Sequence, residues 1–380
     1  MQVKTIKGHF ITEFEQQISL LQHEGFTPDL ALVFCSTSQN IHQLRNIFID
    51  HHIALVGATT AGEIMDSGLE EKSMVAMLMK FDRPTFQTFS FDSSKTDKNL
   101  RETGNDLAKK ALGLYENPVA IVLSGGLRVD GEELVRGILE EHMPADKIYG
   151  ALAGDDLQME NTYVFTHDMH TNKGVVSVIL DGANFQVEGT ATTGWEPIGT
   201  EKTVTRAEGN IVYTIDHVPA LDIFMEYFDK PRERLIETDM IVNELSQYPL
   251  QVKRDKNSHV LRAPMLADTD QGALIFSGTV DEGARIKFSM PPGFETIETT
   301  IHVISELKQQ IPEADALIMF SCKARHQALG PLVEEEVENI RNLWNVPLIG
   351  FFSYGEIGSI AGNTCDFHNE TVSLVVIKES

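Results

Sequence analysis

The sequence has few cysteines and no long hydrophobic run, and each shortage excludes a class of protein. Its three cysteines, Cys35, Cys322 and Cys365, are odd in number and far apart in a chain of 380 residues. They form no Cys-x-x-Cys spacing, which indicates a reducing compartment and gives no zinc framework. We therefore expect the three to be buried and to behave as small hydrophobic residues.

Basic residues are also scarce relative to acidic ones. The chain has 31 Lys and Arg against 56 Asp and Glu, a formal net charge of −25. Such a chain is repelled by nucleic acid and by anionic membrane surfaces, which argues against both as partners. No apolar run approaches the roughly 18 residues that a membrane span needs, and the N-terminal segment MQVKTIKGHF has no apolar signal core. The sequence predicts a cytoplasmic protein.

A glycine-rich turn is repeated along the chain. The pattern Gly-x-x-x-x-Gly-Glu-Ile, preceded by apolar residues, occurs at Gly57 to Ile64 and at Gly350 to Ile357. A looser copy, GALAGDD, occupies Gly150 to Asp156, with Asp155 in place of the glutamate. Each copy follows a strand-like run and a helical pattern, and each is followed by another apolar run. Repetition on this scale indicates duplication of a supersecondary unit.

These patterns predict an α/β fold of mixed sheets with helices on the outer faces. Since 380 residues exceed what one core usually holds, we expect two pseudo-repeated halves, residues 1–190 and 191–380, each with strand-helix-strand units and hairpins. The two full copies of the turn should then superimpose. The helix that carries Val333 and Trp344 should leave its acidic residues in solvent, namely Glu334, Glu335, Glu336 and Glu338.

The repeated turn resembles the phosphate-binding loop Gly-x-x-x-x-Gly-Lys-Ser/Thr, but Glu63 and Glu356 replace its lysine. A carboxylate there would repel a phosphate, which disfavours a nucleoside triphosphatase. The backbone of Gly62 or Gly355 can instead approach a small ligand while the glutamate accepts hydrogen bonds from it. Alternatively, the glycines only permit a positive φ and the glutamates cap backbone N–H groups. Both interpretations remain open.

Ligands of α/β folds gather at the carboxyl ends of strands, so polar residues that follow strands are candidates for a pocket. They are Ser36, Glu63, Ser124, Arg325, His326, Glu356, His368 and Asn369. Ser124 lacks the Gly-x-Ser-x-Gly elbow of a nucleophile, and no catalytic triad can be assembled from the set. We assign no catalytic residue, and an enzyme acting on a small metabolite remains an alternative. His167 and His170 are expected to be exposed turn residues, because two further metal ligands are missing.

Several motifs together resemble the FIST family of signal-transduction sensor domains, in both its N-terminal and C-terminal parts. The resemblance covers roughly Leu30 to Lys378 and rests on GATTAGEI, SGGLRVDG, YGALAGDD, FSCKAR, PLIGFFSYGEIGSI and FHNETVSL. It implies a cytoplasmic module that binds a small ligand, such as an amino acid, and acts on a separate histidine kinase or cyclic-di-GMP enzyme. The candidate ligand-binding residues are then Ser36, Gly62, Glu63, Ser124, Arg325, Gly355, Glu356 and Asn369.

The resemblance extends to stand-alone nitric-oxide-sensing haemoproteins of the family, the NosP-like branch, which makes haem an alternative ligand. His326 is the candidate axial ligand, because it follows Arg325 at a strand end and Arg325 could pair with a propionate. Failing His326, the iron ligand would be His167, His170 or His368.

Overall fold

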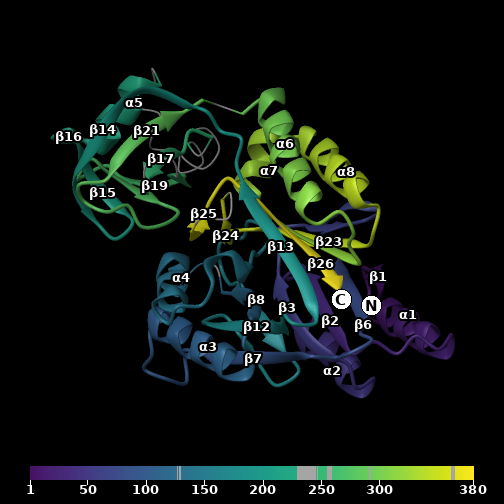
Figure 1. The fold of residues 1–380 in the computed structure, drawn as a ribbon. Coiled ribbons are helices and arrows are strands. Elements are labelled where there is room, and N and C mark those ends of the chain that lie inside the picture. Colours follow the sequence, from purple (N-terminus) through teal and green to yellow (C-terminus); the bar gives the residue numbers. More distant parts are fainter. Residues whose placement is uncertain are drawn as a thin grey trace.

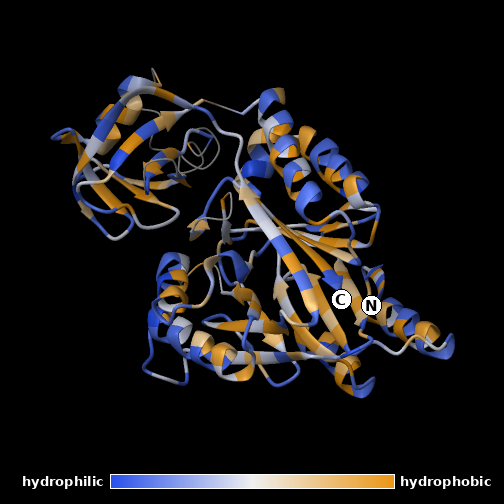
Figure 2. Cartoon of the chain, in the orientation of Figure 1, coloured by the Kyte–Doolittle hydropathy of each residue, from blue (hydrophilic) through white to orange (hydrophobic). Residues whose placement is uncertain are grey.

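The computed structural model describes residues 1–125, 127, 130–228, 245, 247–254, 259–290, 292–360 and 364–380. Within them, three six-stranded sheets form an α/β body and a further eight-stranded sheet forms a separate β domain (Figure 1). The mixed α/β fold that the sequence predicts is confirmed. Hydrophobic residues concentrate on the strands, while the helices are hydrophilic on one side (Figure 2), as expected for helices that cover sheets.

The three sheets of the body share one strand order. Sheet A is β1 (Gln2–Gly8), β6 (Met74–Lys80), β2 (Leu30–Cys35), β3 (Ala54–Thr59), β10 (Val164–Thr166) and β11 (His170–Thr171). Sheet B is β13 (Phe185–Thr192), β26 (Val372–Glu379), β22 (Ala316–Cys322), β23 (Leu348–Ser353), β4 (Glu63–Met65) and β5 (Gly68–Glu70). Sheet C is β7 (Phe86–Asp92), β12 (Gly174–Asp181), β8 (Pro118–Ser124), β9 (Ile148–Leu152), β24 (Glu356–Ser359) and β25 (Cys365–His368).

The repeated unit therefore occurs three times in the described chain. In each sheet two parallel strands are the central pair, namely β2 and β3, β8 and β9, or β22 and β23. Helices connect the strands of each pair: α2 (Ile41–Asp50), α4 (Gly131–Glu140) with a short 3₁₀ turn (Ala145–Lys147), and α7 (Lys323–Leu329) with α8 (Leu332–Trp344). The predicted repeat of two halves thus extends to a third, central copy.

Each unit sends a hairpin into a neighbouring sheet. The hairpin of β4 and β5 follows β3 but pairs with β23, and the hairpin of β24 and β25 follows β23 but pairs with β9. The hairpin of β10 and β11 follows β9 and pairs with β3, which closes the circle. The turns at Gly57 to Ile64 and Gly350 to Ile357 therefore occupy equivalent places, as the sequence predicts.

The register corrects the prediction for the third copy. Glu63 lies opposite Phe351 and Glu356 lies opposite Ala151, in each case next to a repeated glycine. The equivalent place in the third hairpin, opposite Ala58, is held by Val164. Asp155 does not replace the glutamate. It lies in the longer loop before β10 and accepts hydrogen bonds from the backbone N–H groups of residues 159, 160 and 161.

Helices cover the outer faces of the sheets, and the main core lies between the sheets. Besides those named above, the body has α1 (Ile11–His23), α3 (Leu100–Leu114) and α6 (Phe294–Gln310). At the centre, the ring of Phe34 lies 4.6 Å from that of Phe351 and 6.2 Å from that of Phe320. The three cysteines are free and buried, as predicted.

One acidic residue of α8 is not in solvent, contrary to the prediction. Glu336 is 0% exposed, whereas Glu334, Glu335 and Glu338 are exposed. Its carboxylate forms an ion pair with, and accepts hydrogen bonds from, the guanidinium of Arg325, which is also 0% exposed. A buried arginine needs an anion beside it, and the helical pattern alone did not reveal that Glu336 is this anion.

The β domain is inserted between β13 and α6 and has its own hydrophobic core. It contains β14 (Pro197–Glu208), β15 (Ile211–Ile215), β16 (Val218–Pro219), α5 (Ala220–Tyr227), β17 (Leu250–Lys253), β18 (His259–Arg262), β19 (Pro264–Asp268), β20 (Ala273–Phe276) and β21 (Arg285–Ser289). Its first and last strands, β14 and β21, pair at Pro197 and Ser289. The division of the chain at residues 190 and 191 remains a prediction.

Among the described residues, none of the helices is both long and apolar enough to cross a membrane.

The repeated glycines allow the parallel strands to approach closely, which a side chain would prevent. A Cβ atom at Gly350 would lie 1.9 Å from the carbonyl oxygen of Met319 on the neighbouring strand. We predict that Gly350→Ala lowers the free energy of unfolding by about 1–3 kcal/mol or more, measured by urea denaturation. Gly113→Ala, in α3 with nothing within 4 Å of the added atom, is the control and should be neutral or stabilising. Equal stabilities of the two variants would contradict this role.

Candidate ligand site

Strand ends from all three sheets meet at one place. Ser36 follows β2, and its Oγ donates a hydrogen bond of 2.6 Å to Asp156, which follows β9. The backbone N–H of Ser36 donates to the carbonyl oxygen of Ser73, the residue before β6. Lys323 begins α7 directly after β22, and the carboxylates of Glu63 and Asp156 stabilise its charge. We call Ser36, Glu63, Ser73, Asp156, Lys323 and His326 the strand-end cluster.

Glu63 is the buried centre of this cluster. Its carboxylate accepts hydrogen bonds from the hydroxyl of Thr60 and from the hydroxyl of Ser73, the latter at 2.7 Å. The backbone N–H of Ser73 donates to the same carboxylate at 3.2 Å. Burial raises the pKa of Glu63 to about 7, although these hydrogen bonds oppose the rise. Glu63 therefore changes charge near neutral pH.

Glu356 repeats this arrangement in the equivalent hairpin. Its carboxylate accepts from Ser353, three residues earlier, and at 2.6 Å from Thr371, the residue before β26. Burial raises its pKa to about 8, against the effect of the two hydroxyl groups. Each glutamate thus has donors within the protein, which agrees in part with the capping interpretation and does not exclude contact with a ligand.

Lys323 brings a cation to the cluster. Burial lowers the pKa of its ammonium group, and the nearby carboxylates of Glu71, Asp156 and Glu63 counteract that effect. Its Nζ lies 3.2 Å from Nδ1 of His326. Burial, followed by the charge of Lys323, lowers the pKa of His326 to about 4, so this imidazole is neutral at pH 7.

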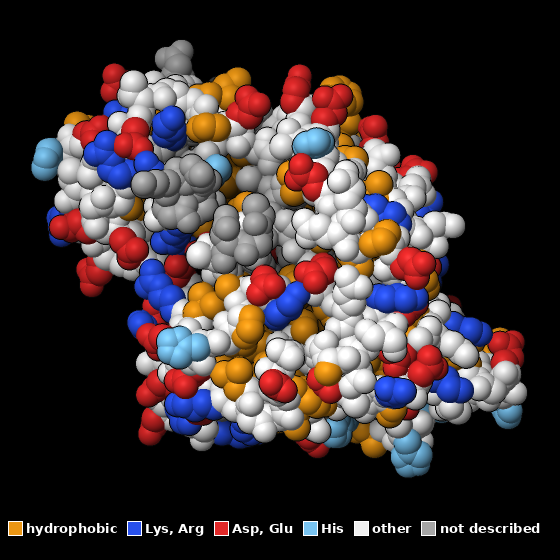
Figure 3. Space-filling view, viewed as in Figure 1, with side chains coloured by type: hydrophobic (Ala, Val, Ile, Leu, Met, Phe, Trp, Pro, Cys, Tyr) orange, Lys and Arg blue, Asp and Glu red, His pale blue; other side chains and the backbone are white. Residues whose placement is uncertain are grey.

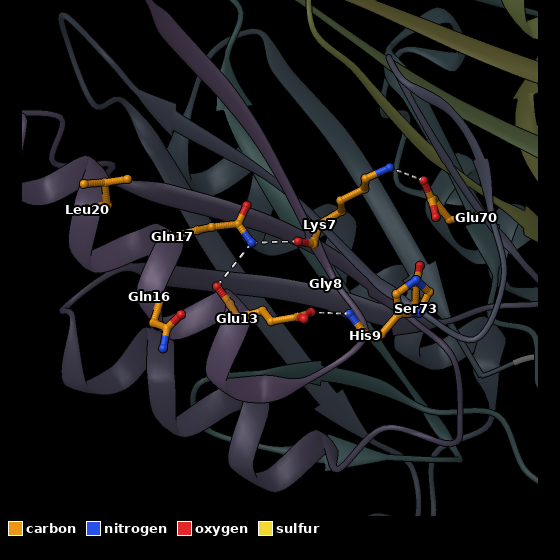
Figure 4. A pocket seen from close by; sticks show the side chains of 9 residues that line it. All are labelled: Lys7, Gly8, His9, Glu13, Gln16, Gln17, Leu20, Glu70 and Ser73. Atoms are coloured by element: carbon orange, nitrogen blue, oxygen red, sulfur yellow. Dashed lines mark hydrogen bonds and ion pairs between the residues drawn. The ribbon is translucent and has the colours of Figure 1, made fainter.

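An open groove reaches the cluster from the side of α1 and β1 (Figure 4). It has a volume of about 550 Å³. Ser73 lies on its wall, is itself almost fully buried, and donates its hydroxyl to Glu63. The groove is lined by Lys7, Gly8, His9, Glu13, Gln16, Gln17, Leu20, Glu70 and Ser73.

The structure brings some of the predicted residues together and separates others. Ser36, Gly62, Glu63 and His326 lie in or next to the strand-end cluster, and Gly62 has a φ of +119° that favours glycine. Ser124 is buried elsewhere and donates to the carbonyl oxygen of residue 174 at 3.2 Å.

The remaining predicted residues lie near the β domain. Asn369 accepts a hydrogen bond of 2.7 Å from Ser277 of that domain. Arg325 is occupied by Glu336, by the hydroxyl of Thr300 and by the carbonyl oxygen of residue 193. Gly355 and Glu356 precede this region in the chain.

Sequence reasoning missed several residues of the site, of which Ser73 and Thr60 matter most. The sequence does contain a signal for Ser73. A serine or threonine directly precedes the apolar run that follows each Gly-Glu turn, namely Ser73 in the first copy and Thr371 in the second. Lys7 and Asp156 have no such signal, because their partners, Glu70 and Ser36, come from distant parts of the chain.

The surroundings of His326 do not fit a haem ligand. Its ring stacks on Phe352, with the centroids 4.1 Å apart and an interplanar angle of 27°. One imidazole nitrogen faces the ammonium group of Lys323. Arg325 directs its N–H groups at protein acceptors, so it has none available for a propionate. A flat apolar slot beside the imidazole, which haem requires, is not formed by these residues.

The raised pKa values of the two buried glutamates predict a pH dependence of stability. A carboxyl group with a raised pKa in the folded state holds its proton there while the unfolded state releases it above about pH 4.5. The contribution of Glu356 to stability is therefore largest below that pH and decreases as the pH rises to about 8. Urea denaturation between pH 5 and 8 should show a smaller decrease in Glu356→Gln and Glu63→Gln than in the wild type. Glu335→Gln, at an exposed position, should follow the wild type, and parallel curves for all four proteins would refute the prediction.

Comparison with known proteins identifies the family. Residues 29–218 match the model of the FIST N domain and residues 220–359 match that of the FIST C domain. An uncharacterised protein of Mycobacterium tuberculosis is 24% identical over 370 residues, which cover 93% of this chain and 92% of the relative. One of Mycobacterium bovis is 25% identical over 304 residues, 76% of this chain and 74% of the relative. Since the two models together span most of the sequence, the chain belongs to the FIST family of signal-transduction sensor domains.

Proposed function

We propose that this protein is a cytoplasmic sensor of a small ligand and that it acts on a separate histidine kinase or cyclic-di-GMP enzyme. One observation carries the proposal. Ser73 lines an open groove of about 550 Å³ and also donates a hydrogen bond to the buried carboxylate of Glu63. A ligand that donates a hydrogen bond to the Ser73 oxygen would bind through the same hydroxyl that donates to Glu63, and would so change the environment of a carboxylate with a pKa of about 7.

The groove favours a polar ligand that carries both charges. Lys7 offers an ammonium group on one wall, paired with Glu70, and Glu13 offers a carboxylate from α1. The two glutamine side chains at residues 16 and 17 add amide donors and acceptors. These groups match a zwitterion such as an amino acid, the ligand class that the family resemblance implies.

The charge of the protein supports a protein partner over nucleic acid. The formal net charge is −25, which repels a phosphate backbone. On the face shown in Figure 3, lysines and arginines are interspersed with acidic side chains rather than gathered in one basic patch.

Binding without turnover is part of the proposal, and an enzyme acting on a small metabolite is the alternative. Ser73, a serine of the groove, donates its hydroxyl to the carboxylate of Glu63 and not to an imidazole, so it is not paired with a histidine as the nucleophile of a serine hydrolase is. Incubation of the protein with a bound ligand, followed by mass spectrometry of that ligand, distinguishes the two. Recovery of the unchanged ligand supports a sensor, and its conversion supports an enzyme.

We predict that replacing Glu63 weakens ligand binding. A screen of amino acids by thermal shift should identify compounds that raise the melting temperature, and calorimetry should give their Kd. Removing a buried charged acceptor costs on the order of 1–3 kcal/mol, so Glu63→Ala should raise the Kd about 5- to 150-fold.

Glu356→Ala removes the equivalent carboxylate, away from the groove, and is the matched variant. If binding is instead lost in Glu356→Ala and kept in Glu63→Ala, the ligand binds at the second glutamate. If both variants bind normally but lose thermal stability, the two glutamates serve as internal caps.

The haem alternative has its own test. Because His326 stacks on Phe352 and faces Lys323, we predict that titration with haemin gives no sharp Soret band that depends on His326. The absorption spectra of the wild type and of His326→Ala should coincide. A sharp band in the wild type that disappears in the variant would establish a haem sensor instead.

A further inference from the structure

We propose that Glu370 marks a second, enclosed ligand site beneath the β domain and that this site takes a protonated amine. The site is distinct from the groove at Ser73, so it goes beyond the sensor function proposed above. It rests on acceptor atoms that are buried and have no donor within the described residues.

Glu370 occupies the place in sheet B that Lys72 occupies in sheet A. Glu63 pairs with Glu70, and Glu356 pairs with His368 in the equivalent hairpin. Lys72 and Glu370 each follow these hairpins by two residues, and both have a left-handed backbone, with φ of 53° and 56°. The two positions are therefore structural equivalents.

Their surroundings differ sharply. Lys72 is exposed, whereas Glu370 is 0% exposed. Within the described part of the chain, both carboxylate oxygens of Glu370 lack a hydrogen-bond partner. Burying a carboxyl group without hydrogen-bond donors costs several kcal/mol of folding free energy. A bound ligand that supplies N–H donors to Glu370 would offset this cost.

Polar atoms of two neighbouring residues also lack a partner in the ranges that the structure describes. Nε2 of His368 lies 3.0 Å from the carbonyl oxygen of residue 358, and a carbonyl accepts only, so Nε2 carries the proton and Nδ1 is an acceptor. This Nδ1 and the hydroxyl of Thr193 have no partner among the described residues. The guanidinium of Arg325 links Thr193 to Glu370, since it donates to the backbone carbonyl oxygens of both.

Two acidic side chains meet at this place, and a bound cation would stabilise their ionised forms. Glu356 is close enough for its charge to raise the pKa of Glu370, in addition to the larger effect of burial. Arg325 is the nearby cation, but it forms an ion pair with the buried carboxylate of Glu336. A small group with several N–H donors and a positive charge, an ammonium group, matches these acceptors. An amino acid matches less well, because its own carboxylate needs donors and would meet the carboxyl oxygens of Glu370 instead.

The β domain contacts the residues that directly precede Glu370. Arg262 of β18 donates to the carbonyl oxygen of Phe367 at 3.0 Å, and Ser277 donates to Asn369 at 2.7 Å. The ring of Trp195, in the link to the β domain, lies 5.2 Å from the guanidinium of Arg325. The β domain therefore helps to bury Glu370, whereas Lys72 at the equivalent position is exposed.

Calorimetric titration of the full-length protein tests the proposal. Ammonium chloride and ethylamine hydrochloride should bind saturably at pH 7.5, whereas potassium chloride and glycine at the same ionic strength should not. Binding of ammonium alone points to the free ion, and binding of ethylamine as well points to the end of a longer amine. Binding of neither amine, or an equal effect of potassium, would overturn the proposal.

Two variants locate the site. Glu370→Gln keeps the shape of the side chain, and the Kd for the amine should rise at least tenfold, while Lys72→Gln at the equivalent exposed position should bind like the wild type. An unchanged Kd in Glu370→Gln would also overturn the proposal. If circular dichroism shows that Glu370→Gln does not fold, Thr193→Val takes its place, and unchanged binding in that variant counts equally against the site.

Discussion

The pairing of each exchanged hairpin with a neighbouring sheet is the constraint on which the rest of the structure depends. Without β4, β24 and β10, the strands β23, β9 and β3 would each present an unpaired edge. The three pairings form a closed circle, so every sheet relies on another unit. They also determine the site, because the exchange carries Glu63 out of its own sheet and places it beside β23, near the start of α7.

Two copies of the same local structure have acquired different surroundings. Glu63 and Glu356 have the same register, the same kind of hydroxyl donors and a raised pKa from burial. The first copy opens through Ser73 to a solvent groove, and the second lies beneath Arg325, Trp195 and the β domain. Burying a carboxylate is expensive, so the retention of the acid in both places shows how strongly the hydroxyl pair supports it.

The sequence was sufficient for the parts of the fold that depend on local pattern. The repeated Gly-Glu turns and the buried cysteines follow from spacing and hydrophobicity, and the structure agrees with them. Contacts between units that exchange hairpins could not be predicted from the sequence. Ser36 and Asp156, for example, form a hydrogen bond but are 120 residues apart in the chain. Glu336 shows the same limit, since only the fold reveals that Arg325 lies beside this acidic residue of α8.

The β domain leaves the body at a single place. Its two links meet where Pro197 pairs with Ser289, and the backbone N–H of residue 290 donates to the carbonyl oxygen of residue 196. Where the β domain contacts the body, Arg254 and Arg262 of the domain form ion pairs with Glu132 of α4. A unit attached at one point and held elsewhere by ion pairs behaves mechanically as a lever. Any small rotation at its paired base would therefore move its far end through a larger distance than the base itself.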